Sequence, residues 1–180
     1  YALAEAARDR GADVTLISGP SALPEPAGVK LVKVGTALEM HAAVISAARS
    51  ADLLIMAAAV ADFRPSEAAP EKIKKGGHAT FTLELVRNPD IIAEAAGPNL
   101  VKVAFAAETG DAARKAREKT GYKGAAFIVA NDVSEPGSGF GTDTNRVTFV
   151  YPDGIDEPMP LLDKLAVAHE LLDRAKTRLK

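Results

Sequence analysis

The stretch of sequence that decides the fold is residues 53–65, which read LLIMAAAVADFRP. It begins as an unbroken apolar run, narrows to three alanines, and ends in Asp62, Phe63 and Arg64 before the proline. A short apolar run of this kind is typical of a strand buried on both faces of a parallel sheet. Ligands bind just beyond the carboxyl ends of such strands. The stretch therefore predicts a ligand site where small side chains admit a ligand and a carboxylate faces a metal ion or a hydroxyl group.

The segment that follows is basic. Residues 71–77 read EKIKKGG, so Lys72, Lys74 and Lys75 lie within four positions. A solvated run of charge is the simpler interpretation of such a segment. These lysines, however, follow a proline and precede two glycines, which is typical of a mobile flap that could close over phosphates. The alanines, the acid and the lysines together predict a site for a nucleoside triphosphate.

Composition narrows the classes of protein. The 180 residues are 47% hydrophobic and 26% charged, with a net charge of −2, which is ordinary for a globular domain and argues against a nucleic-acid partner. The absence of cysteine excludes disulfides and thiolate metal sites. No apolar run is long enough to span a bilayer, and nothing resembles a signal peptide. We therefore expect a cytoplasmic protein without a membrane partner.

Helical and strand patterns alternate along the chain. This predicts an α/β fold with a doubly wound, mostly parallel, Rossmann-like sheet and helices on both faces. We expect one domain over residues 1–180, with a protruding arm or flap at about 63–86 that a partner subunit could cover. The first helix starts at Tyr1 with no cap and no preceding strand, so an N-terminal strand and the loop that leads into this helix are predicted to be missing. Predicted helices cover residues 1–10, 36–49, a segment from 88, 111–120 and 161–179, and predicted strands cover 13–18, 29–34, 53–61, 80–86, 100–106, 125–130 and 146–151.

Three of these strands end in small residues followed by a polar one. The ends lie at residues 59–62, 105–108 and 130–132. Each polar residue alone is explained as a cap or turn residue. A parallel sheet would bring all three ends to one edge, so together they favour a ligand cleft.

Two further motifs are weaker. Asn88, Pro89 and Asp90 have the chemistry of a helix start, although amides exposed there could also serve a ligand. The glycine-rich residues 137–145 precede a strand and not a helix, so they predict a hairpin loop and not a phosphate-binding loop. The three histidines show no metal-ligand spacing.

Six motifs, taken in order, resemble phosphopantothenate–cysteine ligase, the synthetase half of the bacterial bifunctional coenzyme A biosynthesis protein. The resemblance runs over essentially the whole chain. The motifs are residues 58–64 (AAVADFR), 72–75 (KIKK), 88–91 (NPDI), 105–109 (FAAET), 130–133 (ANDV) and 140–145 (FGTDTN).

The resemblance implies a CTP-dependent ligase of coenzyme A biosynthesis. In that family the carboxylate of 4′-phosphopantothenate attacks CTP, and the cysteine amine then displaces CMP from the acyl-cytidylate. Mg²⁺ and lysines would neutralise the charge of the triphosphate. The resemblance also implies a homodimer, within a larger bifunctional oligomer, whose interface includes the predicted arm. It assigns flavin to the decarboxylase half, which this chain lacks.

The resemblance also implies roles for particular residues. Lys72 matches the catalytic lysine of the flap. Ala58 and Ala59 match the platform under the acyl-nucleotide, and Asp62 matches an acid near the ribose or the Mg²⁺. The other positions matched to nucleotide binding are Phe63, Lys75, Asn88, Asp90, Ile91, Phe105 and Asn131.

The chain departs from the family pattern at its beginning. The family's first motif, a glycine- and serine-rich loop with an essential asparagine, would precede Tyr1, so full activity is not expected of the sequence as it stands. Two alternatives remain open. One is an NAD(P)-binding Rossmann oxidoreductase, although no Gly-x-Gly-x-x-Gly turn is present. The other is a nucleotide-binding domain without catalysis. The residues alone do not decide between CTP and ATP.

Overall fold

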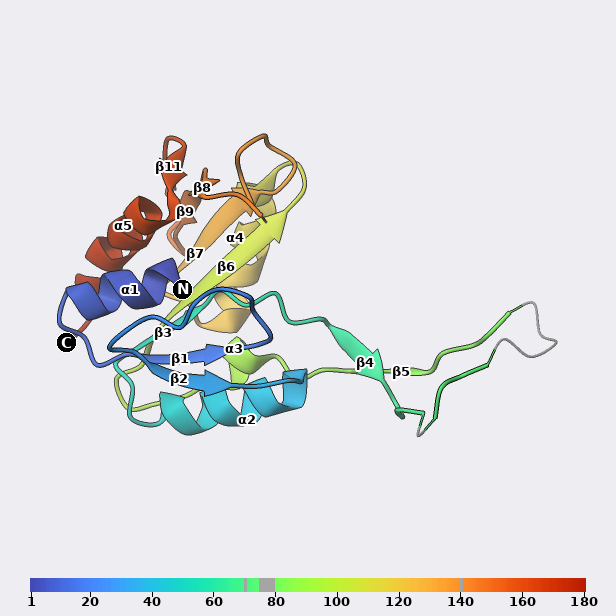
Figure 1. The fold of residues 1–180 in the computed structure, drawn as a ribbon. Helices are drawn as coiled ribbons and strands as arrows, with labels where there is room; N and C mark the ends of the chain where they lie inside the picture. The colour runs from blue at the N-terminus through green and yellow to red at the C-terminus, as the bar shows by residue number, and fades with distance from the viewer. Residues whose placement is uncertain (70, 75–79, 140) are drawn as a thin grey trace.

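The central element of the fold is a five-stranded sheet. The computed structural model describes residues 1–69, 71–74, 80–139 and 141–180 (Figure 1). Three parallel strands form the middle and one edge of this sheet, and two antiparallel strands complete it. In spatial order the strands are β10 (Asp156–Pro158), β9 (Thr148–Val150), β7 (Phe127–Asp132), β6 (Val101–Glu108) and β3 (Leu53–Met56).

Helices lie on both faces of this sheet, which confirms the predicted α/β class with a mostly parallel sheet (Figure 1). Thr36 and Glu39 form the capping box expected at the start of α2. As expected, no side chain caps α1. The helices of the described ranges are α1 (Ala2–Asp9), α2 (Ala37–Ala48), α3 (Ile91–Glu94), α4 (Ala112–Lys123) and α5 (Lys164–Lys176). None of them is long and apolar enough to cross a membrane.

Within the described ranges, six short strands pair outside the central sheet. The first pair is parallel and lies beside α2, whereas the sequence pattern placed these strands in one continuous sheet. The second pair forms the base of a long arm that extends away from the body (Figure 1). The pairs are β1 (Thr15–Ser18) with β2 (Lys30–Lys33), β4 (Phe63–Pro65) with β5 (Leu85–Arg87), and β8 (Thr144–Asn145) with β11 (Leu162–Asp163).

The predicted strand at residues 80–86 is largely wrong. Only Leu85–Arg87 forms a strand, and it pairs with Phe63–Pro65, a segment whose pattern indicated a loop. The alternation of apolar residues normally marks a strand with one buried face. Here Phe81 is 70% exposed, because the arm stands away from the body. The alternating apolar residues of this segment therefore form an exposed apolar surface and not the buried face of a sheet.

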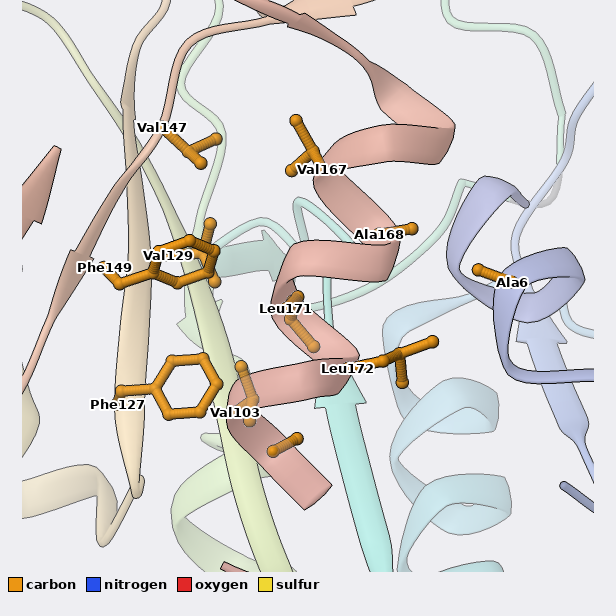
Figure 2. Close-up of a cluster of buried hydrophobic side chains, with 11 residues drawn as sticks. Ala6, Val103, Phe127, Val129, Val147, Phe149, Val167, Ala168, Leu171 and Leu172 are labelled. Atoms are coloured by element: carbon orange, nitrogen blue, oxygen red, sulfur yellow. The ribbon is translucent and has the colours of Figure 1, made fainter. Parts of the chain in front are cut away.

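The largest part of the core lies between the sheet and α5. Phe127 and Phe149 pack edge to face with ring centroids 5.8 Å apart. Figure 2 shows these rings facing Leu171 of α5, while Ala6 of α1 lies on the far side of that helix. All four side chains are almost fully buried. This packing fixes one face of β7 and leaves its opposite face for α4.

The opposite face of the sheet carries small residues. Ala104, Ala106 and Ala130 point to this side, where they pack in one cluster with Ala116 of α4 and Ile92 of α3. Because alanine side chains are short, the helices approach the strands closely. A third cluster joins α2 to α3 and to the end of β3. Together these contacts seat the short helix α3 beside the carboxyl ends of β3 and β6.

The helix start predicted at residue 88 lies two residues further on. Asp90 caps α3, its carboxylate accepting from the Ala93 amide at 3.2 Å, and Asn88 and Pro89 precede the helix. The glycine-rich segment forms the expected hairpin between β7 and β9. It is held by the buried hydroxyl of Ser138, which donates to Oδ1 of Asn145 at 2.7 Å.

Candidate functional site

A cleft of about 400 Å³ opens at the carboxyl end of β3, next to the middle of β6 and beside the base of the arm. Three segments that are distant in sequence meet there: the end of β3 with the residues that follow it, the return strand of the arm with α3, and the middle of β6. This is the edge at which ligands bind in parallel sheets. The lining residues are Met56, Ala58, Val60, Ala61, Asp62, Phe63, Arg87, Asn88, Pro89, Asp90, Ile91, Ile92, Ala104 and Phe105.

One wall of the cleft is apolar. Met56 and Val60 pack with Ile91 against the cluster that joins α2 to α3, and Phe105 packs at the edge of the cluster under α5. These side chains are held by the core, so the wall is preformed. Such a wall suits the aliphatic or aromatic part of a small molecule.

The polar centre of the cleft is Asn88, whose side chain is 8% exposed. Its Nδ2 donates to the carbonyl oxygen of Ala61 at 2.8 Å, and its backbone amide donates to the carbonyl of Asp62 at 2.8 Å. Its Oδ1 accepts from Nη1 of Arg64 at 3.0 Å. The same Nη1 donates to the carbonyl of Arg87 at 2.9 Å. These bonds tie the two strands of the arm together at the rim of the cleft.

Lys102 holds the short helix α3 in the wall of the cleft, close to the negative charge of Asp90. Nζ of Lys102, on β6, donates to the carbonyl of Ile92 at 2.9 Å and to that of Ala95 at 3.3 Å. Burial lowers the pKa of Lys102, and the negative charge of Asp90 opposes that shift. The positive charge of Lys102 thus lies at the carboxyl end of α3, which is the negative end of the helix dipole. This contact holds Ile91 and Ile92 in the wall.

The cleft has charges of both signs. Asp62 and Asp90 contribute carboxylates, and Arg87 contributes a guanidinium group. Within the described part of the chain, no hydrogen bond or ion pair engages the side chain of Arg87. A guanidinium group of this kind is suited to bind a phosphate or carboxylate of a ligand. The carboxylates are suited to accept hydrogen bonds from hydroxyl or amide groups.

The structure brings together most of the residues predicted from the sequence. Seven predicted site residues line the cleft: Ala58, Asp62, Phe63, Asn88, Asp90, Ile91 and Phe105. Their roles with a ligand stay predictions.

Four other predicted residues are placed elsewhere or fall outside the description. Ala59 and Lys72 are exposed and are not part of the lining, Lys72 lying on the arm. Asn131 is buried on β7, paired with Ala107 of β6 at the same edge of the sheet, and it does not line the cleft. Lys75 lies outside the described residues.

Sequence reasoning missed Arg87 and gave no role to Arg64. Both lie on the paired strands of the arm, and their part in the cleft depends on that pairing. The one signal in the sequence was that Arg87 immediately precedes the Asn88 motif.

Asp62 was also predicted, tentatively, to hold Mg²⁺ through a triphosphate. Over the described ranges, no three His, Cys, Asp or Glu side chains come together where they could hold a metal ion. The carboxylate of Asp62 therefore has no set of protein ligands around it that would complete such a site in this part of the chain.

The mostly parallel sheet with helices on both faces defines this chain as an α/β domain, and its cleft lies beside the carboxyl end of β3. The family model that matches it covers residues 1–179 and is described as the DNA/pantothenate metabolism flavoprotein C-terminal domain. The chain belongs to this family.

Among its relatives is a coenzyme A biosynthesis bifunctional protein CoaBC from Vibrio cholerae, 45% identical over 176 residues. The match covers 96% of this chain and 44% of that relative, so the chain spans less than half of the relative's length. The predicted relation to a bifunctional coenzyme A biosynthesis protein is confirmed at this level.

Solved structures agree with the fold. The crystal structure of the C-terminal domain of a CoaBC protein matches with a TM-score of 0.79 and 36% identity, covering 98% of this chain and 80% of that one. A Cab2 mutant in complex with phosphopantothenate-cysteine matches with a TM-score of 0.62 and 20% identity, covering 84% of this chain and 54% of that one. The second likeness concerns the fold alone.

The family description corrects the predicted activity. It names a flavoprotein of pantothenate metabolism, whereas the resemblance implied a CTP-dependent phosphopantothenate–cysteine ligase. On this comparison the ligase activity, the enzyme class and CTP binding are wrong. The same description corrects the predicted cofactors. The prediction gave this chain Mg²⁺, with CTP as co-substrate, and assigned flavin to a decarboxylase half that the chain lacks, whereas the family description names a flavoprotein.

The flavoprotein description raises the question of whether the cleft fits a flavin mononucleotide. Such a group needs a donor for its phosphate and further donors along its ring system. In the described lining the carboxamide of Asn88 is engaged within the protein, and Arg87 is the one cationic side chain. No buried side-chain polar atom in the described ranges lacks a partner. The side chains of the cleft therefore do not fit a flavin.

Proposed function

We propose that this chain is one domain of a bifunctional protein of coenzyme A biosynthesis, and that its cleft binds the phosphopantothenoyl part of a coenzyme A precursor. The proposal rests on one observation: an apolar wall, two carboxylates and Arg87 meet in one cleft of about 400 Å³ at the carboxyl end of β3 and the middle of β6. Residues 1–180 act as a single domain.

The chemistry of the cleft matches a phosphopantothenoyl group part by part. The branched aliphatic part of such a ligand suits the wall of Met56, Val60 and Phe105. Its hydroxyl and amide groups are donors that the carboxylates of Asp62 and Asp90 can accept from. Its phosphate is an anion that Arg87 can bind. The relatives are named for coenzyme A biosynthesis, and a protein of similar fold was solved with phosphopantothenate-cysteine.

The test compares two ligands that differ only in the phosphate. Titration calorimetry measures binding of 4′-phosphopantothenate and of pantothenate to the protein and to Arg87→Gln. We expect the phosphorylated ligand to bind more tightly and Arg87→Gln to weaken it about tenfold or more, since a charge-assisted bond is lost. Arg114→Gln is the control, because Arg114 lies exposed on α4 and pairs with Asp111 and Glu118 of the same region. Equal affinity for the two ligands, or no binding of either, overturns the proposal.

A second copy of this chain covers the arm in the proposed assembly. Apolar side chains gather on the arm, where Phe63, Phe81, Leu83 and Leu85 are each about half exposed or more. The arm extends from the body (Figure 1), and these four side chains stay exposed among the residues that the structure describes. Large exposed apolar patches of this kind mark protein interfaces. A homodimer is consistent with the interface that the resemblance implies for this segment.

A further inference from the structure

We propose that Arg64 is a positioning residue: it fixes the carboxamide of Asn88 and thereby couples the arm to the anion-binding side of the cleft. The inference rests on the proposed function, because it concerns the affinity of the same cleft for a phosphorylated ligand. Arg64 itself is not among the lining residues, so it acts through its neighbours.

A single nitrogen of Arg64 makes both contacts. Nη1 donates to Oδ1 of Asn88 at 3.0 Å and to the carbonyl oxygen of Arg87 at 2.9 Å. Arg64 lies on β4 opposite Val86 of β5, so both bonds cross from the outgoing to the returning strand of the arm. Bonds from a charged donor are stronger than neutral ones. The guanidinium group therefore holds the returning strand at Arg87, the last residue of β5.

The orientation of the Asn88 carboxamide depends on this contact. With Oδ1 directed to Arg64, Nδ2 is directed to the carbonyl of Ala61, to which it donates at 2.8 Å. The backbone amide of Asn88 also holds the carbonyl of Asp62. In this way one buried amide fixes the backbone on both sides of the rim. If the partner of Oδ1 is lost, the amide keeps its bond to the Ala61 carbonyl and loses one of the two contacts that fix its orientation.

The two charged residues of the rim are positioned by the same bonds. Arg64 binds the carbonyl of Arg87, and Asn88 binds that of Asp62. The side chains of Arg87 and Asp62 line the cleft. A loss of Arg64 would therefore leave both charges in the cleft but free their backbones to move. A positioning role therefore predicts that the affinity for the ligand falls although every side chain that lines the cleft is still present.

A purely structural role of Arg64 and a positioning role predict different outcomes for its variants. Neither Arg64 nor Asn88 belongs to any of the three buried apolar clusters, so Arg64→Gln should remain folded at about 25 °C, with a thermal midpoint lowered by roughly 2–8 °C for the two hydrogen bonds lost. It should still weaken binding of 4′-phosphopantothenate about tenfold, with little effect on pantothenate. Arg64→Lys should recover most of that loss, because one ammonium nitrogen can donate to both oxygens as Nη1 does.

The experiment combines titration calorimetry with hydrogen exchange on the whole protein. Exchange of the amides of residues 61–66 and 85–88 should accelerate in Arg64→Gln and return towards the wild-type rate in Arg64→Lys. A double-mutant cycle with Asn88→Ala should be non-additive, because both variants break the same bond.

The outcomes separate this inference from the function on which it rests. If Arg87→Gln loses affinity and Arg64→Gln binds as the wild type does, the positioning role is overturned while the proposed function stands. Unchanged amide exchange in Arg64→Gln also overturns it, whatever the ligand. If the wild type binds neither ligand, the proposed function fails and the positioning role fails with it.

Discussion

Nζ of Lys102 lies 2.9 Å from the carbonyl oxygen of Ile92, so strand β6 holds the carboxyl end of the four-residue helix α3. The carbonyl of Ala95 accepts from the same group at 3.3 Å. A helix this short has little stability of its own. Its place in the wall of the cleft therefore depends on Lys102 and on the burial of its two isoleucines.

Lys102→Met is expected to destabilise the protein. The substitution leaves two carbonyl oxygens without their donor, which costs about 1–3 kcal/mol, partly offset because a buried charge is removed. Urea denaturation measures the change in the free energy of unfolding. Lys30→Met is the control, since Lys30 is exposed on β2. Equal stability of the wild type and Lys102→Met would mean that the carbonyls are satisfied without the lysine.

The pair of Glu157 and Arg174 makes stability depend on pH. Nε of Arg174 donates to Glu157 at 3.0 Å, and this contact lowers the pKa of the Glu157 carboxyl below its ordinary 4.5. A carboxyl with a lowered pKa in the folded state stabilises the fold above its unfolded pKa. That contribution is lost as the pH falls through the folded pKa.

Glu157→Gln should therefore be less stable than the wild type at pH 7, and the difference should shrink as the pH falls below about 4.5. Denaturation curves at neutral and acidic pH measure this difference. Glu118→Gln is the matched control on the exposed surface of α4, where the ion pair with Arg114 is open to solvent. A difference between Glu157→Gln and the wild type that is independent of pH would contradict the role of the ion pair.

Two glycines should respond to alanine in opposite directions. A Cβ at Gly97 would meet the carbonyl oxygen of Ala48 and lie 3.3 Å from Cβ of Leu100. Gly97→Ala should therefore cost about 1–3 kcal/mol of stability. A Cβ at Gly121, within α4, would meet nothing within 4 Å. Gly121→Ala should stabilise by up to about 1 kcal/mol. Thermal melting of both variants measures the contrast, and a loss of stability in Gly121→Ala would contradict it.

The central strands were predictable because their sequences carry the signal on their own. Runs of buried apolar residues mark β6 and β7, and the capping box of Thr36 marks the start of α2. The strand-end rule then predicts that Asp62 and Phe105 meet at one edge, as they do in the cleft. Each of these inferences needs only local pattern and the topology of parallel sheets.

The base of the arm was not predictable in the same way. The pairing of β4 with β5 joins residues at least twenty positions apart, and neither strand has an apolar period that demands it. The role of Arg64 follows only from that pairing, as does the place of Arg87 in the cleft. The chemistry of Asn88 was taken as that of a helix cap, whereas Asp90 caps the helix and Asn88 binds the arm.

The last prediction concerns the arm as an interface. Phe81 and Leu83 are 70% and 56% exposed, and a second copy of the chain is proposed to cover them. Phe81→Ser with Leu83→Ser should shift the protein from dimer to monomer in analytical ultracentrifugation, because the interface loses its apolar centre. The thermal midpoint of the monomer should change little, since neither side chain belongs to the buried clusters. Leu23→Ser is the control, an equally exposed leucine outside the arm. A wild type that sediments as a monomer at all concentrations, or a double variant that remains a dimer, would refute the interface.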